Sequence, residues 1–367
     1  MATVTIKDVT AKLEQLAPRI YQEDYDNSGL ITGNPKATVT GILVTLDCTE
    51  AVVEEAIREN CNLVVAHHPI LFKGIKKLTG QNYVERTLIK AIRNDIAIYA
   101  IHTNLDNVHT GVNKKIAEQL GLVNLEILAP KPGTLLKLVT FIPAAQAEAV
   151  TQKLYEAGAG QIGSYKNCSF NVAGEGTYLP TEGANPYQGT PGKPERATEI
   201  RVEVILPVSA REQVLHALKK NHPYEEVAYY LTALENGNQE VGSGMVGELV
   251  EPMEGLAFLK HVKNKMRADC VRHTAIPQNA VKKVAICGGS GSFLLHKAMA
   301  AGADAYVSAD FKYHEFFDAD GKILIADIGH YESEQFTKDL LHAFLRENFP
   351  TFAIAFSKVV TNPICYL

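Results

Sequence analysis

The amino-acid sequence predicts an α/β protein, namely a duplicated two-half α/β domain that is interrupted by an inserted ferredoxin-like (α+β) domain. Strand-like apolar runs alternate with amphipathic helical segments in residues 1–130, and the same order returns in residues 246–367. Residues 131–245 show a different order of expected strands and helices. A chain of 367 residues is also long for one domain. We therefore expect a discontinuous domain, 1–130 with 246–367, and a second domain at 131–245.

The first segment alternates strands and helices in the way that is typical of a largely parallel sheet. Thr49 can cap one helix, and Gly121 can end another. The expected strands cover residues 41–47, 63–66 and 96–101, and the expected helices cover 5–16, 50–60, 86–94 and 112–120. This alternation predicts a doubly wound sheet.

The middle segment predicts a small α+β domain. Strands are expected at 135–143, 164–174, 198–206 and 227–234, and helices at 146–157 and 209–221. Residues 175–197 are rich in Gly, Pro, Thr and Glu and indicate an exposed loop. The order strand–helix–strand, loop, strand–helix–strand is typical of a ferredoxin-like fold.

The third segment repeats the organisation of the first. Strands are expected at 281–287, 303–310 and 322–328, with a helix at 293–301. The glycine-rich residues 288–292 lack the spacing of a phosphate-binding loop, so a tight turn between strand and helix is the better interpretation. The repeated order indicates an internal duplication whose two halves could face each other across a shared site.

Composition places the chain among ordinary soluble proteins. A net charge of -5 and a pI near 6.2 argue against general nucleic-acid binding. Apolar runs fall short of the roughly 20 residues that a transmembrane helix needs, and the N-terminus lacks a signal-peptide pattern. The six cysteines form no C-x-x-C pair, which indicates reduced thiols. We therefore expect a cytoplasmic protein with no membrane partner.

Two adjacent histidines, His67 and His68, end the apolar run at residues 63–66. Ligands gather at the carboxyl ends of parallel strands, so these imidazoles are expected at a site edge. Because successive strand side chains alternate in direction, the pair could serve two metal ions, or one ion and a substrate. The alternative is one buried, hydrogen-bonded histidine beside an exposed one.

His330 and Glu334 lie four residues apart at the start of an expected helix that runs to about Asn348, so they share one helix face. Alone, they could be an ordinary solvated pair. Together with His67, His68 and Asp106, they supply three imidazoles and two carboxylates at strand ends. Such a set can bind two metals and leave open positions, as catalytic sites do. Its mixed N/O chemistry favours zinc, iron, manganese, nickel or cobalt.

Four motifs together resemble the Nif-three-like family, many of whose members are called GTP cyclohydrolase 1 type 2 homologues. They are Asp-Asn-Ser-Gly-Leu at 26–30, Ala-His-His-Pro at 66–69, His-Thr-Asn-Leu-Asp at 102–106 and Gly-His-Tyr-x-Ser-Glu at 329–334. Residues 310–314 and the inserted segment resemble the long bacterial form. Within the insert, residues 221–226 resemble a CutA/PII-like domain.

The resemblance implies a dinuclear centre with two divalent transition metal ions. Its ligands would be His67, His68, Asp106, His330 and Glu334, with either Glu334 or Asp106 bridging the ions. It also implies ring-shaped homohexamers in which the inserted domain caps the openings.

Two functions fit these expectations. The first is a metal-dependent hydrolase that acts on a nucleotide-like or phosphorylated small molecule, with His102 or His314 moving the proton. His102 could instead support a ligand, and a structural role for His314 is about equally plausible. The second is a non-enzymatic metal-binding or regulatory assembly that senses a small-molecule effector through its PII-like domain.

Overall fold

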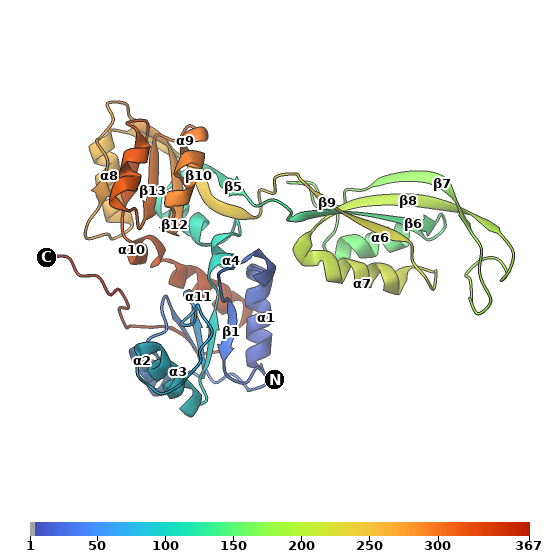
Figure 1. Ribbon diagram of the computed structural model, residues 1–367, viewed down its shortest axis with the longest axis horizontal. Coiled ribbons are helices and arrows are strands. Elements are labelled where there is room, and N and C mark those ends of the chain that lie inside the picture. Colours follow the sequence, from blue (N-terminus) through green and yellow to red (C-terminus); the bar gives the residue numbers. More distant parts are fainter. Residues whose placement is uncertain (1–3) are drawn as a thin grey trace. The chain divides into compact units, whose positions relative to one another are not determined.

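The computed structural model describes residues 4–367, which form two compact units (Figure 1). The first unit holds the chain up to Pro130 and again from Gln239 to the end, and the second holds the residues between. The chain thus returns to the first unit before residue 246, the expected position. The reason is that Gly242 already begins strand β10 (Gly242–Met253), which pairs with β5 (Leu122–Pro130).

The first half of the first unit is built on a five-stranded sheet in the order β1-β4-β3-β2-β15. The strands are β1 (Gly29–Thr32), β2 (Ile42–Thr45), β3 (Leu63–Ala66), β4 (Ala97–Ala100) and β15 (Ile354–Phe356). All pair in parallel except β1, which is antiparallel to β4. Strands β2, β3 and β4 are buried along their whole length, which explains their uninterrupted apolar sequences.

The helices of this half include the four that the sequence indicates, although α3 begins three residues earlier than expected and the short α4 was not expected. They are α1 (Ile6–Leu16), α2 (Glu50–Arg58), α3 (Tyr83–Arg93), the short α4 (Thr103–Asp106) and α5 (Val112–Leu120), preceded by the 3₁₀ turn η1 (Arg19–Tyr21). The Thr49 side chain accepts a hydrogen bond from the Val52 amide and so caps α2. Gly121 ends α5 in the left-handed conformation, with φ of 72°.

The second half has a six-stranded sheet in the order β11-β14-β13-β12-β10-β5. Its remaining strands are β11 (Arg272–His273), β12 (Val281–Ser290), β13 (Ala305–Ala309) and β14 (Leu324–Asp327). Its helical segments are α8 (Gly255–Lys265), η3 (Ser292–Leu294), α9 (Leu295–Ala300), η4 (Tyr313–Ala319), α10 (His330–Glu334) and α11 (Thr337–Asn348). Within residues 4–367, no helix is long and apolar enough to span a membrane.

The two halves repeat one arrangement of strands. In each, three strands consecutive in their sheet, β2-β3-β4 or β12-β13-β14, pair in parallel, and the third pairs with an antiparallel strand, β1 or β11. The sheets exchange one strand each, because β15 joins the first sheet and β5 joins the second. The carboxyl ends of two sets of parallel strands thus contribute to one unit.

The expected helix from His330 to Asn348 is divided in two. Helix α10 ends at Glu334, and α11 begins at Thr337. Between them, the Gln335 side chain donates a hydrogen bond to the Met266 carbonyl. The division leaves the first turn, which carries the candidate ligands, intact.

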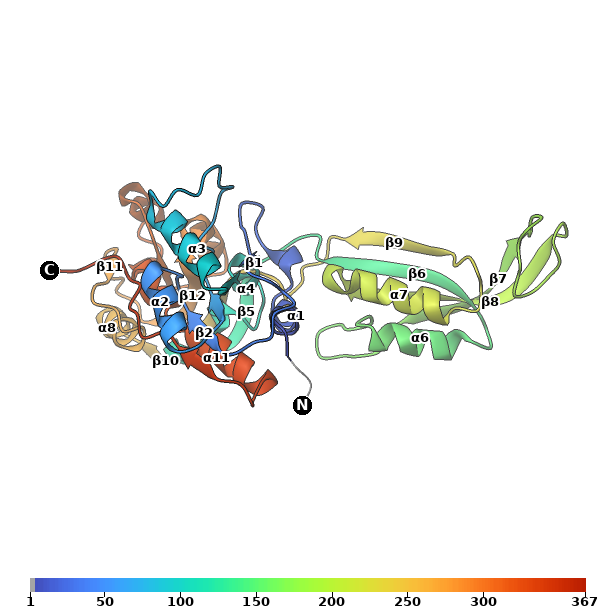
Figure 2. The same ribbon diagram turned by 90° about the horizontal axis from the view of Figure 1, so that it is seen from below.

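The second unit is a four-stranded antiparallel sheet in the order β7-β8-β6-β9. Its elements in chain order are β6 (Leu135–Pro143), α6 (Ala147–Glu156), β7 (Phe170–Tyr178), β8 (Glu195–Pro207), η2 (Val208–Ala210), α7 (Arg211–Asn221) and β9 (Tyr229–Leu234). Both helices cover one face of the sheet (Figure 2), where side chains such as Leu138, Leu154, Val204 and Leu218 form the core. This βαββαβ order with the two middle strands of the chain adjacent is the ferredoxin-like arrangement.

The loop expected at 175–197 is shorter than the sequence indicates. Residues Glu175 to Tyr178 pair with Thr198 to Glu195 and so extend β7 and β8. Local composition favoured a loop because of the glycines at 174 and 176, but cross-strand hydrogen bonds outweigh that weak local preference.

Candidate metal centre

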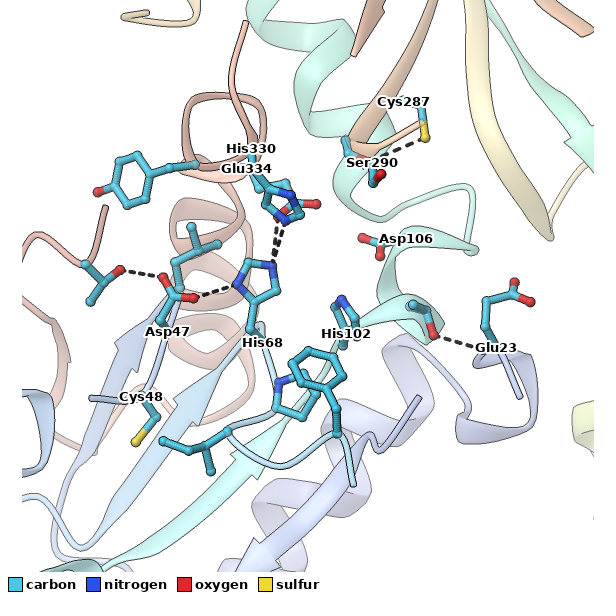
Figure 3. A pocket seen from close by; sticks show the side chains of 18 of the residues that line it. Glu23, Asp47, Cys48, His68, His102, Asp106, Cys287, Ser290, His330 and Glu334 are labelled. Carbon is cyan, nitrogen blue, oxygen red and sulfur yellow. Dashed lines mark hydrogen bonds and ion pairs between the residues drawn. The ribbon is translucent and has the colours of Figure 1, made fainter. Parts of the chain in front are cut away.

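A cavity of about 1080 Å³ lies in the first unit where the strand ends of both halves meet. Asp47 follows β2, His68 follows β3, and His102 follows β4, whereas His330 follows β14. Figure 3 shows the imidazoles of His68 and His330 turned toward each other beside Glu334, and Asp106 lies near this group. The cavity therefore collects histidines and carboxylates from distant parts of the chain, such as His68 and Glu334, which are 266 residues apart.

His67 is fully buried, and its ring has a fixed orientation. Its Nδ1 lies 2.8 Å from the carbonyl oxygen of Ile101. A carbonyl can only accept, so Nδ1 carries the proton and Nε2 is left with a free lone pair. This is the tautomer that a metal-binding imidazole needs.

His68 and His330 converge on the same carboxylate. Their Nε2 atoms lie 2.9 Å and 3.1 Å from Oε2 of Glu334 and 3.4 Å from each other. Each Nδ1 is held by another carboxylate, at 2.7 Å from Asp47 and 2.6 Å from Asp310. The His330–Glu334 contact is the expected one between residues one helical turn apart.

Two buried atoms in this cluster lack a hydrogen-bond partner. Nε2 of His67 and Oδ1 of Asp106 are buried, lie 3.5 Å apart, and make no hydrogen bond to any of residues 4–367. His67 Nε2 is also 3.8 Å from Oε2 of Glu334. Buried polar atoms are normally satisfied, so two acceptor atoms that face each other in this way, an imidazole lone pair and a carboxylate oxygen, fit a cation between them.

The ligand atoms form overlapping groups of the size that a metal ion requires. Their members lie within 4.8 Å of one another, in the groups His68–His330–Glu334, His67–Asp106–Glu334 and His67–His68–His102. Imidazole nitrogens of His67, His68 and His330 thus surround Glu334. Asp106 lies beside His67, and these residues together are the five expected ligands. The residues present fit a metal ion by donor type and by spacing.

The pKa shifts of the clustered side chains show that carboxylates surround the imidazoles. Burial would lower the pKa of His68 and His330, but their carboxylate partners raise the pKa values to about 10 and about 11, respectively. Burial, and then the charge of Glu334, raises the pKa of Asp106 to about 7. The cluster therefore holds protons between its imidazoles and carboxylates, and a metal ion that binds there must displace them.

Cys287 also lines the cavity, but it is a poor ligand. Burial, and then the charge of Asp106, raises the pKa of the thiol to about 12. The thiol is therefore protonated at neutral pH, whereas metal binding requires the thiolate. This agrees with the expectation that the cysteines are free thiols, although Cys365 is exposed.

The two expected proton-transfer residues lie in different surroundings. His102 lines the cavity, and its Nδ1 is 2.8 Å from Asp26 of the Asp-Asn-Ser-Gly-Leu motif. Burial would raise the pKa of Asp26, but hydrogen bonds from His102 and Thr103 keep it well below its usual value. His314 is instead exposed on η4, where its ring contacts Tyr313 and Phe317. The structure thus brings His102, but not His314, to the five expected ligands.

The carboxylates that orient the histidines were only partly visible in the sequence. Asp310 and Asp47 each lie at the end of an expected strand, but the sequence does not pair them with His330 and His68, as the structure does. Thr361, near the chain end, donates a hydrogen bond of 2.6 Å to Asp47. A polar residue just beyond a parallel strand was the available signal for Asp47, whereas no local pattern indicates Thr361.

The orientation of His330 by Asp310 leads to a test. Replacing Asp310 with asparagine should lower metal affinity by about 10–100-fold, because the charge that holds Nδ1 of His330 is lost. Asparagine tolerates the left-handed backbone at this position, where φ is 58°. Affinity would be measured by competition with a chromogenic zinc chelator.

The matched control is Asp320→Asn. Asp320 has a similar φ of 48° but is exposed and pairs with Lys322. Equal affinities in the two variants would contradict a role for Asp310 in orienting the histidine.

The chain matches the profile of the Duf34/NIF3 (NGG1p interacting factor 3) family over residues 4–363. A Bacillus subtilis (strain 168) protein named "GTP cyclohydrolase 1 type 2 homolog" is 37% identical over 371 positions, covering 100% of this chain and 99% of the relative. A protein of the same name from Staphylococcus epidermidis is 36% identical, covering 98% and 99%.

Solved structures agree with these relatives. A Bacillus cereus protein related to NIF3 superposes with a TM-score of 0.88 at 36% identity, and a Staphylococcus aureus protein superposes with 0.79 at 29% identity. Both matches cover 100% of either chain. The sequence profile, the full-length relatives and the fold therefore agree that this chain belongs to the Duf34/NIF3 family.

Proposed function

We propose that this protein is a hydrolase that uses two divalent transition metal ions, bound by His67, His68, Asp106, His330 and Glu334. The observation that carries the proposal is the convergence of three imidazole Nε2 atoms on one buried carboxylate oxygen, at 2.9 to 3.8 Å. The groupings His68–His330–Glu334 and His67–Asp106–Glu334 share Glu334. Glu334 would therefore belong to both groups of ligands, and zinc, iron, manganese, nickel and cobalt would all suit the N/O donor set.

When bound, the ions would supply Lewis-acid chemistry, lowering the pKa of water and polarising the scissile group of the substrate. The chain itself would position that chemistry. Asp47, Asp310 and the Ile101 carbonyl fix three imidazole rings through their Nδ1 atoms. Asp26 holds the Nδ1 side of the His102 ring. The other edge of the ring, which faces the cavity, would take up or release the proton.

Aromatic side chains in the cavity lining favour a substrate with a planar ring. Tyr25, Phe72 and Phe293 line the cavity and are more than half exposed, and Phe72 lies edge-on to His102 at 5.7 Å. Exposed aromatic rings are suited to stack on a base. We therefore propose a nucleotide-like or other phosphorylated small molecule as the substrate class.

The first test is elemental analysis of protein that was purified without an affinity tag or chelator, followed by a hydrolysis screen. We expect two equivalents of transition metal per chain and turnover of nucleoside phosphates or phosphomonoesters. His102→Gln should keep its metal but lower kcat by about 10²–10⁴-fold, as expected for loss of a proton-transfer group. If metal-loaded protein turns over no compound in the screen, the hydrolase proposal is wrong, whereas the proposal of a metal site is unaffected.

A second candidate is a non-enzymatic metal-binding or regulatory assembly that senses a small molecule through the second unit, which would be a CutA/PII-like domain. What supports it is that residues 131–238 form a separate compact unit with its own cavity. The discriminating observation is an effector that shifts metal affinity in a protein without turnover.

We also propose that the chain works in the cytoplasm as a homohexamer, where its six cysteines would stay reduced. Light scattering of the metal-loaded protein tests this assembly, and a monomeric mass would contradict it.

A further inference from the structure

The second unit contains a cavity of about 690 Å³ that the metal centre does not explain. It lies on the sheet face opposite the helices. On β8, Val202 and Val204 pack into the core under the helices, so the alternating Glu199 and Arg201 point to the other face. The connection between β7 and β8 supplies further lining, including Tyr187.

Three tyrosine rings stand together in this lining. The ring of Tyr224 lies 6.2 Å from that of Tyr178 and 6.0 Å from that of Tyr187. Two of the rings are held from outside: Tyr178 donates a hydrogen bond to the Gln188 carbonyl, and Gln146 donates one to the Tyr187 hydroxyl. The Tyr224 ring packs against His222, 4.9 Å away. The rings are therefore fixed before any ligand enters.

A buried carboxylate accompanies the rings. Glu199 is only 8% exposed, although it lies on the face without helices. Room for it comes from Gly176, where a Cβ atom would lie 2.1 Å from Oε2 of Glu199. Arg201, the arginine in the same lining, is engaged by Glu203 at 2.7 Å. The Glu199 carboxylate thus has no arginine or lysine ion-pair partner among residues 4–367, so a cationic ligand could pair with it.

The Tyr224 hydroxyl lies in the same lining. Its oxygen is buried and meets no partner at hydrogen-bonding geometry in the described part of the chain. Burial, and then the interaction of the hydroxyl with the side chain of nearby Glu199, raises the pKa of this phenol. A hydroxyl and a carboxylate are therefore both available to a ligand inside one cavity.

We propose that this cavity binds an organic ammonium ion. Its N–H groups would donate to Glu199, and its alkyl carbons would lie against the three tyrosine rings, whose faces attract cations. The remaining charged side chains of the lining agree in sign, because Glu175, Glu225 and Glu226 outnumber Arg201. This site shares no residue with the metal centre, so its test does not depend on whether the protein is a hydrolase.

The test is calorimetric titration of the full-length protein with butylammonium, butyltrimethylammonium and neutral butan-1-ol. We expect butylammonium to bind at least about tenfold more tightly than the alcohol, with butyltrimethylammonium between them because it has no N–H to donate. Tyrosine fluorescence offers a second readout, since the chain contains no tryptophan.

Variants separate the carboxylate from the rings. Glu199→Gln, which preserves shape, should weaken butylammonium binding about tenfold or more, and Tyr224→Leu should weaken both cations. Tyr224→Phe keeps the ring and should keep most of the binding. Glu212→Gln is the matched control, because Glu212 is exposed on α7, pairs with Arg211 and does not line the cavity.

The proposal is overturned if the alcohol binds as tightly as butylammonium, if Glu199→Gln binds it as well as the unaltered protein does, or if no probe binds up to about 10 mM. The comparison of the three probes on the unaltered protein needs no variant, so a variant that fails to fold leaves the test intact. Metal content should be the same in all folded variants.

Discussion

Glu334→Gln is expected to lower metal affinity by about 100-fold or more, the largest effect of any single substitution in this protein. Glu334 is the carboxylate on which the Nε2 atoms of His67, His68 and His330 converge, and it is only 3% exposed. Glutamine keeps the shape but removes the charge, so the loss should exceed the 10–100-fold that is typical of groups that merely orient a ligand. Elemental analysis and chelator competition measure it.

The matched control is Glu332→Gln on the same short helix. Glu332 is similarly buried, at 4%, but its side chain accepts a hydrogen bond from Asn362 instead of meeting the histidines. Glutamine can still accept that bond, so metal content should not change. Unaltered metal binding in Glu334→Gln, in a variant with the same fold, would show that the cluster is not a metal centre.

Gly289→Ala is expected to lower both stability and metal affinity. Gly289 has a φ of 62°, a conformation that costs other residues about 1–2 kcal/mol. An added Cβ would also lie 2.5 Å from Oε1 of Glu334 and 3.2 Å from the His330 ring. The strand β12 thus approaches the centre so closely that only glycine leaves room for Glu334. Thermal unfolding with and without added zinc measures both effects.

Gly302→Ala separates the two causes. Gly302 also has a left-handed backbone, with φ of 72°, but a Cβ atom there meets open space. This control should show the loss of about 1–2 kcal/mol and keep its metal affinity. If both variants bind metal equally well, the close approach of β12 has no bearing on the centre.

The elements and many of the site residues were open to prediction because their signals are local. The cap at Thr49, the end of α5 at Gly121 and the adjacency of His330 and Glu334 all follow from contacts within a few residues. The family and the repeated order of strands were also recognisable. The boundary at Gln239, the break after Glu334 and the extension of β7 were not, because each depends on hydrogen bonds to distant segments.

The same division holds for function. The sequence by itself determined which side chains follow parallel strands, and it therefore identified histidines and carboxylates as candidate ligands. Only the tertiary structure decided that His68 meets Glu334 across 266 residues, and that Asp47 and the Ile101 carbonyl orient the imidazoles. It likewise turned Glu199 into a buried carboxylate among tyrosines. The physical reason is that local geometry sets contacts one helical turn apart, whereas contacts between distant segments depend on how the sheets and their connections pack.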